Sequence, residues 1–374
     1  MPAEDRIGAL AARWAAEGRT LHAIYDDATR PVGALGDDVP VATLATFTAG
    51  LAAGGDEDIP CTLVADVTVR ATHQGQGLMR RLMDAAAHDA ATPLMALHAA
   101  HPARYARFGF APAIRSACVE VDCARFRLRD PAAGTVHEAG THRADELARA
   151  VAMSSAVLRF GALTPALTGA ESDDGARCLV HTDDRGVVDG VLTWAFLGWT
   201  PRAQVIEVRA ESYATVDAHA ALWQTLCSTG IASTIRAADS RLEDPVAWMI
   251  EDRAARRVTA VTDGYSLRVL DPARALAMRG YSCPDTSLVI EVADGTGAAS
   301  GRWLLAVTRG RATVEPTARA ADVRLGAREL AALFLAGTRA DALHAAGLLA
   351  DGRDARILDD LLRWPVEARS GLHF

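Results

Sequence analysis

Alternating apolar and polar residues mark strands early in the chain. The segment "VPVATLATFTAGLAAGGDEDIPCTLVADVTVR" predicts two strands joined by a glycine-containing loop at 54–56. The second strand runs from about Pro60 to Val69 and stops at "ATHQGQG". Apolar residues then recur at helical spacing, at Leu78, Leu82 and Ala86. The pattern therefore predicts a strand, a glycine-bearing turn and a helix N-terminus in succession.

The same strand–strand–helix order recurs in the middle of the chain. "GVVDGVLTWAFLGW" (186–199) and "AQVIEVRAESYA" (203–214) predict two strands, and "TVDAHAALWQTLCS" (215–228) predicts a helix after them. The turn into this helix contains neither glycine nor arginine. We therefore expect no phosphate site there.

A third pattern begins near Gly264. Asp271 is typical of a helix cap, Pro272 stands at the first helical position, and Gly280 follows the end of that helix. The strands "TSLVIEV" and "RWLLAVT" come next. Three further helices are predicted at "ARELAALFLAG", "RADALHAAGLLA" and "ARILDDLLRW".

The composition is that of an ordinary globular protein. The 374 residues are 50% hydrophobic and 23% charged, and this length predicts two or three domains. The longest apolar runs are far shorter than the ~20 residues that cross a bilayer, and no secretory leader is visible, so we expect a cytoplasmic protein without membrane contact. The net charge of −8 disfavours nucleic acid as a partner and suits cationic small molecules.

Cysteine and histidine form no metal or nucleophile motif. The six cysteines have no pair at metal-ligand spacing, which predicts reduced, mostly buried thiols, although Cys61 or Cys118 could in principle carry an acyl group. His98 and His101 lie three residues apart near His88, but a metal would need a third convergent ligand. We interpret these histidines as loop residues and expect no metal.

The turn at 74–80 predicts an anion site. The first N–H groups of a helix lack intrahelical partners, and the helix dipole adds partial positive charge there. Gly75 and Gly77 allow close approach of a phosphate, and Arg80 and Arg81 could add charge. A mononucleotide loop would need a lysine, which the chain lacks, and a dinucleotide fingerprint would need a glycine where Arg80 stands. On spacing alone, a plain tight turn remains the alternative interpretation.

The surroundings of this turn carry a resemblance. "VTVRATHQGQGLMRRLM" (67–83) resembles the acyl-CoA loop of GNAT N-acetyltransferases, which have Gln/Arg-x-x-Gly-x-Gly/Ala after a strand. "ALHAAHPARYARFGFAPA" (96–113) is similar to the Tyr-x-Arg-Phe-Gly-Phe/Tyr segment of one branch, the Eis-like acetyltransferases, which also accept a large residue at the Met79 position. Similar segments at 211–226 and 263–281, and a terminal phenylalanine, extend the likeness over nearly the whole chain.

The resemblance implies a fold class and a division of the chain. The fold is α+β, with two tandem GNAT-like units, the second degenerate, followed by a sterol-carrier-protein-like α/β domain. We place the units at 1–126, 127–262 and 263–374, with a linker at "RDPAAGTVHEAG" and the C-terminal tail in the active site. Family members begin with a strand and helix ahead of Met1, so we expect a short first unit and an altered amine pocket. A homohexamer is implied by the resemblance alone.

The resemblance also implies an acetyl-CoA-dependent N-acetyltransferase that acts on small polyamines or aminoglycoside-like amines. The backbone around Val67 to Val69 would pair with the pantetheine arm, and one of its N–H groups would stabilise the thioester oxygen. The residues expected to bind acetyl-CoA are Val67, Thr68, Val69, Gln74, Gly75, Gln76, Gly77, Leu78, Met79, Arg80, Ala100 and His101.

Two proton-transfer groups follow from the same resemblance. Tyr105 is expected to be the general acid, because a phenol of pKa ~10 can protonate a thiolate leaving group of pKa ~8.5. The C-terminal carboxylate of Phe374 is expected to be the general base, and burial would have to raise its pKa from ~3.5. His373, where the family often has an acid, is an alternative base.

Two other functions remain open at this point. The acceptor could be a protein lysine instead of a small amine, which composition does not distinguish. Alternatively, the chain could be a non-enzymatic carrier in which the C-terminal domain binds an apolar ligand. An intact "GQG" turn and Tyr105 speak against the carrier.

Overall fold

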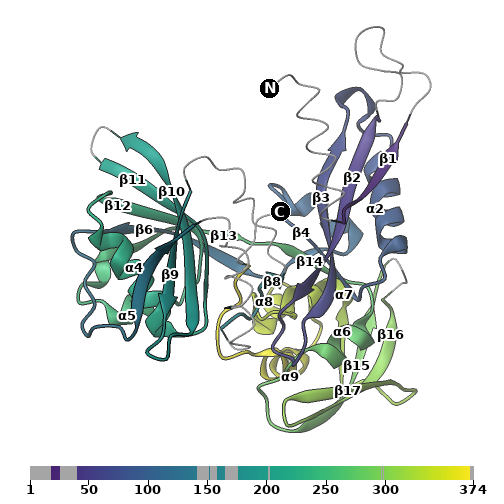
Figure 1. The fold of residues 1–374 in the computed structure, drawn as a ribbon. Coiled ribbons are helices and arrows are strands. Elements are labelled where there is room, and N and C mark those ends of the chain that lie inside the picture. The colour runs from purple at the N-terminus through teal and green to yellow at the C-terminus, as the bar shows by residue number, and fades with distance from the viewer. Residues whose placement is uncertain are drawn as a thin grey trace.

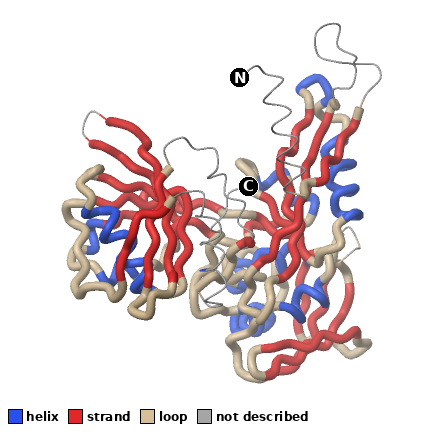
Figure 2. The backbone as a smooth tube through the Cα atoms, viewed as in Figure 1, coloured by secondary structure: helices blue, strands red, loops and turns tan. Residues whose placement is uncertain are grey.

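The computed structural model describes residues 18–25, 40–140, 151, 158–164, 176–200, 203–295, 297 and 299–370. These residues form three sheets with helices packed against them (Figure 1). Strands make up most of the first two parts, whereas the third part combines strands with several helices (Figure 2).

The first sheet has seven strands in the order β1-β2-β3-β4-β14-β5, with β8 paired to β2. The strands β3 and β4 are parallel, and β2 is antiparallel to β3. The helix α2 (Leu78–Asp89) covers one face through its buried side chains Leu78, Leu82, Met83 and Ala86, which confirms the predicted helix and its apolar stripe. The strands are β1 (Thr20–Ile24), β2 (Ala42–Leu51), β3 (Ile59–Val69), β4 (Leu94–Leu97), β5 (Ala111–Pro112), β8 (Leu163–Thr164) and β14 (Ser266–Val269).

The second sheet also has seven strands, in the order β13-β6-β12-β11-β10-β9-β7. Its β10–β11 hairpin and the helix α4 (Val216–Ser228) confirm the predicted strand–strand–helix repeat, and α5 (Val246–Met249) follows. The strands are β6 (Arg115–Asp122), β7 (Thr135–Ala139), β9 (Arg177–Thr182), β10 (Val188–Thr200), β11 (Ala203–Tyr213), β12 (Thr234–Ser240) and β13 (Arg256–Asp263).

The third sheet has four strands in the order β17-β16-β15-β18. Asp271 caps α6 by accepting a hydrogen bond from the N–H of Arg274, with Pro272 in the first turn, as the sequence predicts. The elements of this part are α6 (Pro272–Met278), β15 (Thr286–Ala293), β16 (Gly301–Thr308), β17 (Arg311–Pro316), β18 (Val323–Gly326), α7 (Ala327–Leu333), α8 (Ala340–Ala345) and α9 (Gly352–Leu362).

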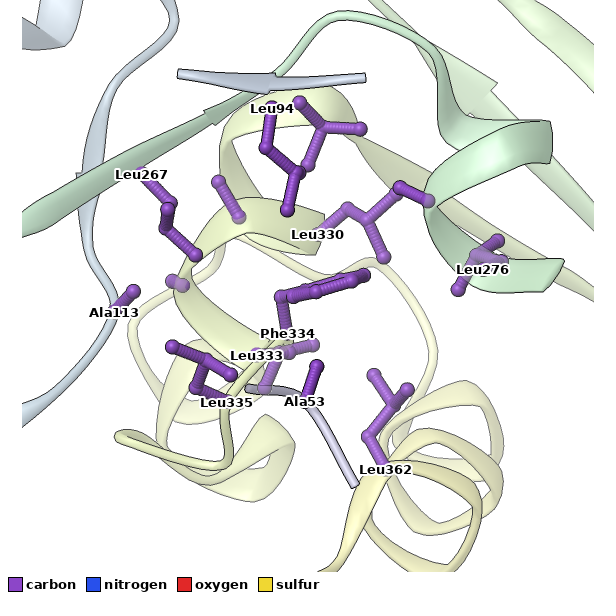
Figure 3. Close-up of a cluster of buried hydrophobic side chains, with 14 of the residues drawn as sticks. Ala53, Leu94, Ala113, Leu267, Leu276, Leu330, Leu333, Phe334, Leu335 and Leu362 are labelled. Carbon is purple, nitrogen blue, oxygen red and sulfur yellow. The ribbon is translucent and has the colours of Figure 1, made fainter. Parts of the chain in front are cut away.

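The first and third parts share one hydrophobic core. Figure 3 shows Leu94 and Leu267, both from the first sheet, facing Leu330 and Phe334 from the segment at and just after α7. All four side chains are at most 1% exposed. The C-terminal part is therefore fused to the first sheet through a continuous apolar interior.

The sheets exchange strands across both boundaries drawn from the sequence. The strand β6 lies within 1–126, yet it pairs with β12 and β13 of the second sheet. The strand β14 lies within 263–374, yet it pairs with β4 and β5 of the first sheet. Local patterns identify such strands but not their partners, because pairing across a sheet is set by contacts that are distant in sequence. The divisions at 126 and 262 remain predictions.

Candidate active site

The site is built where two parallel strands of the first sheet stop pairing. The last pair between β3 and β4 is Val64 with Leu97, while β3 continues to Val69. A β-bulge interrupts the pairing of β3 with β2 just beyond this point, and Asp66 there has φ of +53°. A bulge turns the strand away from its partner, so the backbone after Val64 is free to face a ligand.

The N-terminus of α2 lies at the end of this strand. Its cap is Gly77 with φ of +76°, no side chain caps it, and the first backbone bond runs from the N–H of Arg81 to the Gly77 oxygen. Gly75 has φ of +80°, and a Cβ atom at either glycine would meet no atom within 4 Å. Glycine is therefore required here by the backbone conformation. The uncapped N–H groups and the open space above them fit a pyrophosphate.

Tyr105 lies in the same apolar cluster as the end of β3. It joins two 3-10 turns, η3 (Pro102–Arg104) and η4 (Ala106–Phe108), and its ring contacts Phe110 edge-on at 6.3 Å between centroids. Tyr105, Val67, Val69 and Met79 are half-buried against one set of core residues. Burial raises the pKa of the Tyr105 hydroxyl, and the charge of Arg104 opposes this only in part. The phenol therefore stays protonated at neutral pH.

Two arginines add positive charge beside the helix N-terminus. Arg80 of α2 and Arg107 of η4 lie over the buried ring of Phe108, with guanidinium carbons 5.9 and 5.1 Å from its centroid. Both arginine side chains are exposed at the surface. Arg107 was not among the predicted site residues, because no spacing rule links η4 to the start of α2.

The predicted acetyl-CoA-binding residues gather at this edge of the first sheet. They lie at the end of β3, in the turn before α2, in the first turn of α2 or just after β4. Val67, Val69 and Met79 are half-buried and Leu78 is buried. The exposed members are Thr68, Gln74, Gly75, Gln76, Gly77, Arg80, Ala100 and His101.

The corresponding turn of the second sheet is closed. Only two residues separate Tyr213 at the end of β11 from Val216 at the start of α4. The Thr215 hydroxyl caps this helix by accepting from the N–H of Ala218 at 3.1 Å. This helix end is already satisfied by its own side chain, in contrast to that of α2.

The C-terminal segment is described as far as Ser370, so Phe374, His373 and their predicted roles lie outside the described residues. The N–H of Leu163 donates to the Ser370 oxygen at 3.4 Å, and the N–H of Arg369 donates to Phe160 at 2.9 Å. The neighbouring Gly161 accepts from the Tyr265 hydroxyl at 2.6 Å, and the Tyr265 ring contacts His98, the residue after β4, at 6.0 Å. Sequence patterns gave no sign of this chain of contacts.

Other candidate chemistry finds less support. Burial raises the pKa of the fully buried Cys61 thiol, which makes it a poor nucleophile. Within the described ranges no three His, Cys, Asp or Glu side chains gather closely enough to hold a metal ion. None of the described helices has the length and apolarity needed to span a membrane.

Comparison with known families identifies the three parts. Two matches are to an acetyltransferase (GNAT) domain, at residues 13–113 and 162–318, and one is to a sterol carrier protein domain at 272–368. The chain is 32% identical over 336 residues to an uncharacterized N-acetyltransferase of Streptomyces griseus subsp. griseus, which covers 83% of this chain and 80% of that one. It is 30% identical over 349 residues to N-acetyltransferase Eis of Mycobacterium bovis. This match covers 87% of this chain and 83% of that one.

The chain belongs to the Eis-like GNAT N-acetyltransferases. Solved structures agree on the fold. Eis1 from Mycobacterium abscessus superposes with a TM-score of 0.78 at 20% identity, over 95% of this chain and all of that one. A GCN5-related N-acetyltransferase from Kribbella flavida superposes with a TM-score of 0.76 at 23% identity. The match covers 100% of this chain and 92% of that one.

Membership in the Eis-like family confirms several predictions. The fold is two tandem GNAT units followed by a sterol-carrier-like domain. The protein is an acyltransferase that uses acetyl-CoA as its co-substrate. The expected shortness of the first unit and its effect on the amine pocket remain predictions.

Proposed function

We propose that this enzyme transfers acetyl from acetyl-CoA directly to the amine of a small polyamine or aminoglycoside-like acceptor. The observation that carries the proposal is the uncapped, glycine-flanked N-terminus of α2 beside Tyr105 and the free end of β3. In this account the N–H groups of 75–80 hold the pyrophosphate. The pantetheine arm then runs along Val67 to Val69, which brings the thioester to the phenol.

Tyr105 is proposed as the general acid. The neutral amine attacks the thioester carbon to give a tetrahedral intermediate. As it collapses, the carbon–sulfur bond breaks, the phenol protonates the departing thiolate, and the excess proton of the new amide nitrogen returns to the phenolate. The raised pKa of Tyr105 supports this role, because it keeps the proton in place until the thiolate forms.

The carboxylate of Phe374 is proposed as the general base that takes the proton of the acceptor ammonium. Ser370 accepts a hydrogen bond from Leu163. The nearby Gly161 oxygen accepts from the Tyr265 hydroxyl, and the Tyr265 ring contacts His98 just after β4. Four extended residues beyond Ser370 can reach up to about 14 Å. We propose that the tail uses this reach to end near Tyr105. His373 is the alternative base within that tail.

The test is release of free CoA thiol from acetyl-CoA with a panel of amines, using purified protein. We expect release with polyamines or aminoglycosides, and the net charge of −8 supports a cationic acceptor. Absence of release across the panel would contradict the proposal. Faster turnover of lysine peptides than of small amines would favour the protein-acetylating alternative, whereas family membership already disfavours a non-enzymatic carrier.

We further propose that the enzyme acts in the cytoplasm as a homohexamer, which the family resemblance suggests. The edge strand β13 supports an assembly surface, because seven of its eight residues are exposed, including Val258 and Val261. Light scattering on the purified protein tests this proposal, and a monomeric mass would contradict it.

A further inference from the structure

In each GNAT unit two parallel strands diverge beyond their last pair. Side chains fill the space between them in the second unit, whereas the first unit keeps it open. In the first sheet, Val64 and Leu97 are the last parallel pair, and Val67 and Ala99 lie three and two residues further on. In the second sheet, Val208 and Ala237 are the last pair of β11 and β12, and Glu211 and Asp239 lie three and two residues further on. Glu211 and Asp239 therefore occupy the positions of Val67 and Ala99.

Arg369 from the C-terminal segment bridges these two residues. Its Nη1 lies 3.2 Å from Glu211 Oε1, and its Nε donates to the Asp239 backbone oxygen at 2.9 Å and lies 3.7 Å from Oδ2 of that side chain. Arg369 is 9% exposed and Glu211 is 8% exposed. The guanidinium thus lies between the diverging strands of the second unit, where the first unit would place a thioester.

Glu367 and Arg241 form a second attachment of the same segment. One Glu367 carboxylate oxygen accepts from the N–H groups of Leu242 and Glu243 at 2.6 and 3.1 Å. The Nε of Arg241 donates to the Glu367 backbone oxygen at 2.9 Å. Glu367 is therefore fixed to the loop that follows β12, and Arg369, on the other side of Ala368, is fixed to the strands β11 and β12.

The charges around Arg369 are balanced by a buried network. Burial would raise the pKa of Glu211, but the charges of Arg369 and His219 outweigh it and lower the pKa to about 2. Asp244 pairs with His219 at 3.1 Å and with Arg256 at 3.1 Å. Glu211 is therefore ionised at neutral pH, and a buried ion pair of this kind is costly to break from one side.

We propose that the degenerate second unit is the socket of the C-terminal tail, and that Arg369 is a positioning residue for the acetyl transfer. Arg369 and Glu367 fix the segment in the second unit, and Ser370 is held against Leu163 of the first sheet, from where the tail would continue to the active site. The inference rests on the proposed role of the tail carboxylate. In this proposal the second unit holds the C-terminal segment between its diverging strands and does not bind acetyl-CoA.

The test compares Arg369→Met with Arg369→Lys, Glu367→Ala and the control Arg302→Met. Arg302 pairs with Glu291 at 2.6 Å on the third sheet, and it makes no hydrogen bond or ion pair with the described part of the C-terminal segment, 363–370. We expect Arg369→Met to lower kcat roughly 10- to 100-fold at pH 7, with KM for acetyl-CoA unchanged within about twofold. The deficit should shrink toward pH 10 as the amine deprotonates unaided. Arg369→Lys should recover part of kcat, and Arg302→Met should retain it.

A structural readout separates this inference from the proposed chemistry. Hydrogen–deuterium exchange of peptides covering 363–374 should be faster in Arg369→Met and Glu367→Ala than in the wild type and in Arg302→Met. Wild-type kcat together with unchanged exchange in the tail variants would overturn the socket. If Arg369→Met fails to fold, kcat and exchange of the Glu367→Ala variant test the socket instead, because that change leaves no buried charge unpaired. If the wild type transfers no acetyl, the proposed function fails, while the exchange data still judge the socket.

Discussion

Tyr105 is half-buried among apolar side chains from β3, α2 and the turns after β4. Its pKa lies above the ordinary value of ~10 because burial disfavours the phenolate. The protonated, acid-competent form therefore persists to a higher pH than in a solvent-exposed tyrosine. An acid of this kind sets the alkaline limb of a pH–rate profile, since activity is lost as the group deprotonates.

Replacing Tyr105 with phenylalanine should lower kcat about 100-fold or more and remove the alkaline limb above pH ~10. The packing with Phe110 should persist because only the hydroxyl is lost. Tyr281→Phe is the matched control: its hydroxyl donates to the Leu276 oxygen at 2.8 Å, so the change should cost about 1 kcal/mol of unfolding free energy and leave kcat intact. A Tyr105→Phe enzyme with normal kcat would show that another group protonates the thiolate.

At the scale of elements, the two GNAT units differ most at the start of one helix. Eight residues connect β3 to α2 and two connect β11 to α4, from Val69 to Leu78 and from Tyr213 to Val216. The longer turn leaves the first N–H groups uncapped, whereas Thr215 caps the shorter one. The same supersecondary unit therefore leaves its helix N-terminus open to the proposed anion in one copy and caps it with its own side chain in the other.

Gly77→Ala tests whether the α2 turn holds the pyrophosphate. The substitution should cost about 1–2 kcal/mol of unfolding free energy, because φ is +76° at this position. A Cβ atom there would meet no atom within 4 Å, so backbone strain is the whole cost. Gly186→Ala, in the β9–β10 turn with φ of +82° and equally open space, should cost a similar amount. Only Gly77→Ala should raise KM for acetyl-CoA. Equal KM values for the two variants would place the pyrophosphate elsewhere.

Elements with local signals were predictable from the sequence. The apolar stripe of α2, the Asp271 cap of α6 and the repeat of β10, β11 and α4 follow from spacing and capping chemistry. The strand β17 was missed, because only Ala312 and Val314 of its residues are even partly buried and its apolar pattern is weak.

Over the whole molecule, the features that sequence reasoning did not reach depend on contacts between distant segments. The placement of β14 in the first sheet and the bridge of Arg369 to Glu211 join residues more than a hundred positions apart. No local pattern encodes such pairs. The anion site at 74–80 is predicted by its glycines and the helix start as well as by the family resemblance, whereas the role of Tyr105 follows from the resemblance alone, and both remain predictions.

The shared core makes the C-terminal part dependent on the first sheet. Leu330 and Phe334 are buried beside Leu94 and Leu267 (Figure 3), and β14 pairs with β4 and β5 of the first sheet. The segment 263–374 made alone should therefore expose this surface and show no cooperative thermal unfolding by circular dichroism. A sharp transition for the isolated segment would show that it is an independent domain.

The most direct measurement of the central claim is a crystal structure of the full chain with CoA bound. The account predicts pyrophosphate oxygens within hydrogen-bonding distance of the N–H groups of 75–80, and the CoA sulfur beside the Tyr105 hydroxyl. CoA bound away from the start of α2, or with its sulfur far from Tyr105, would contradict it.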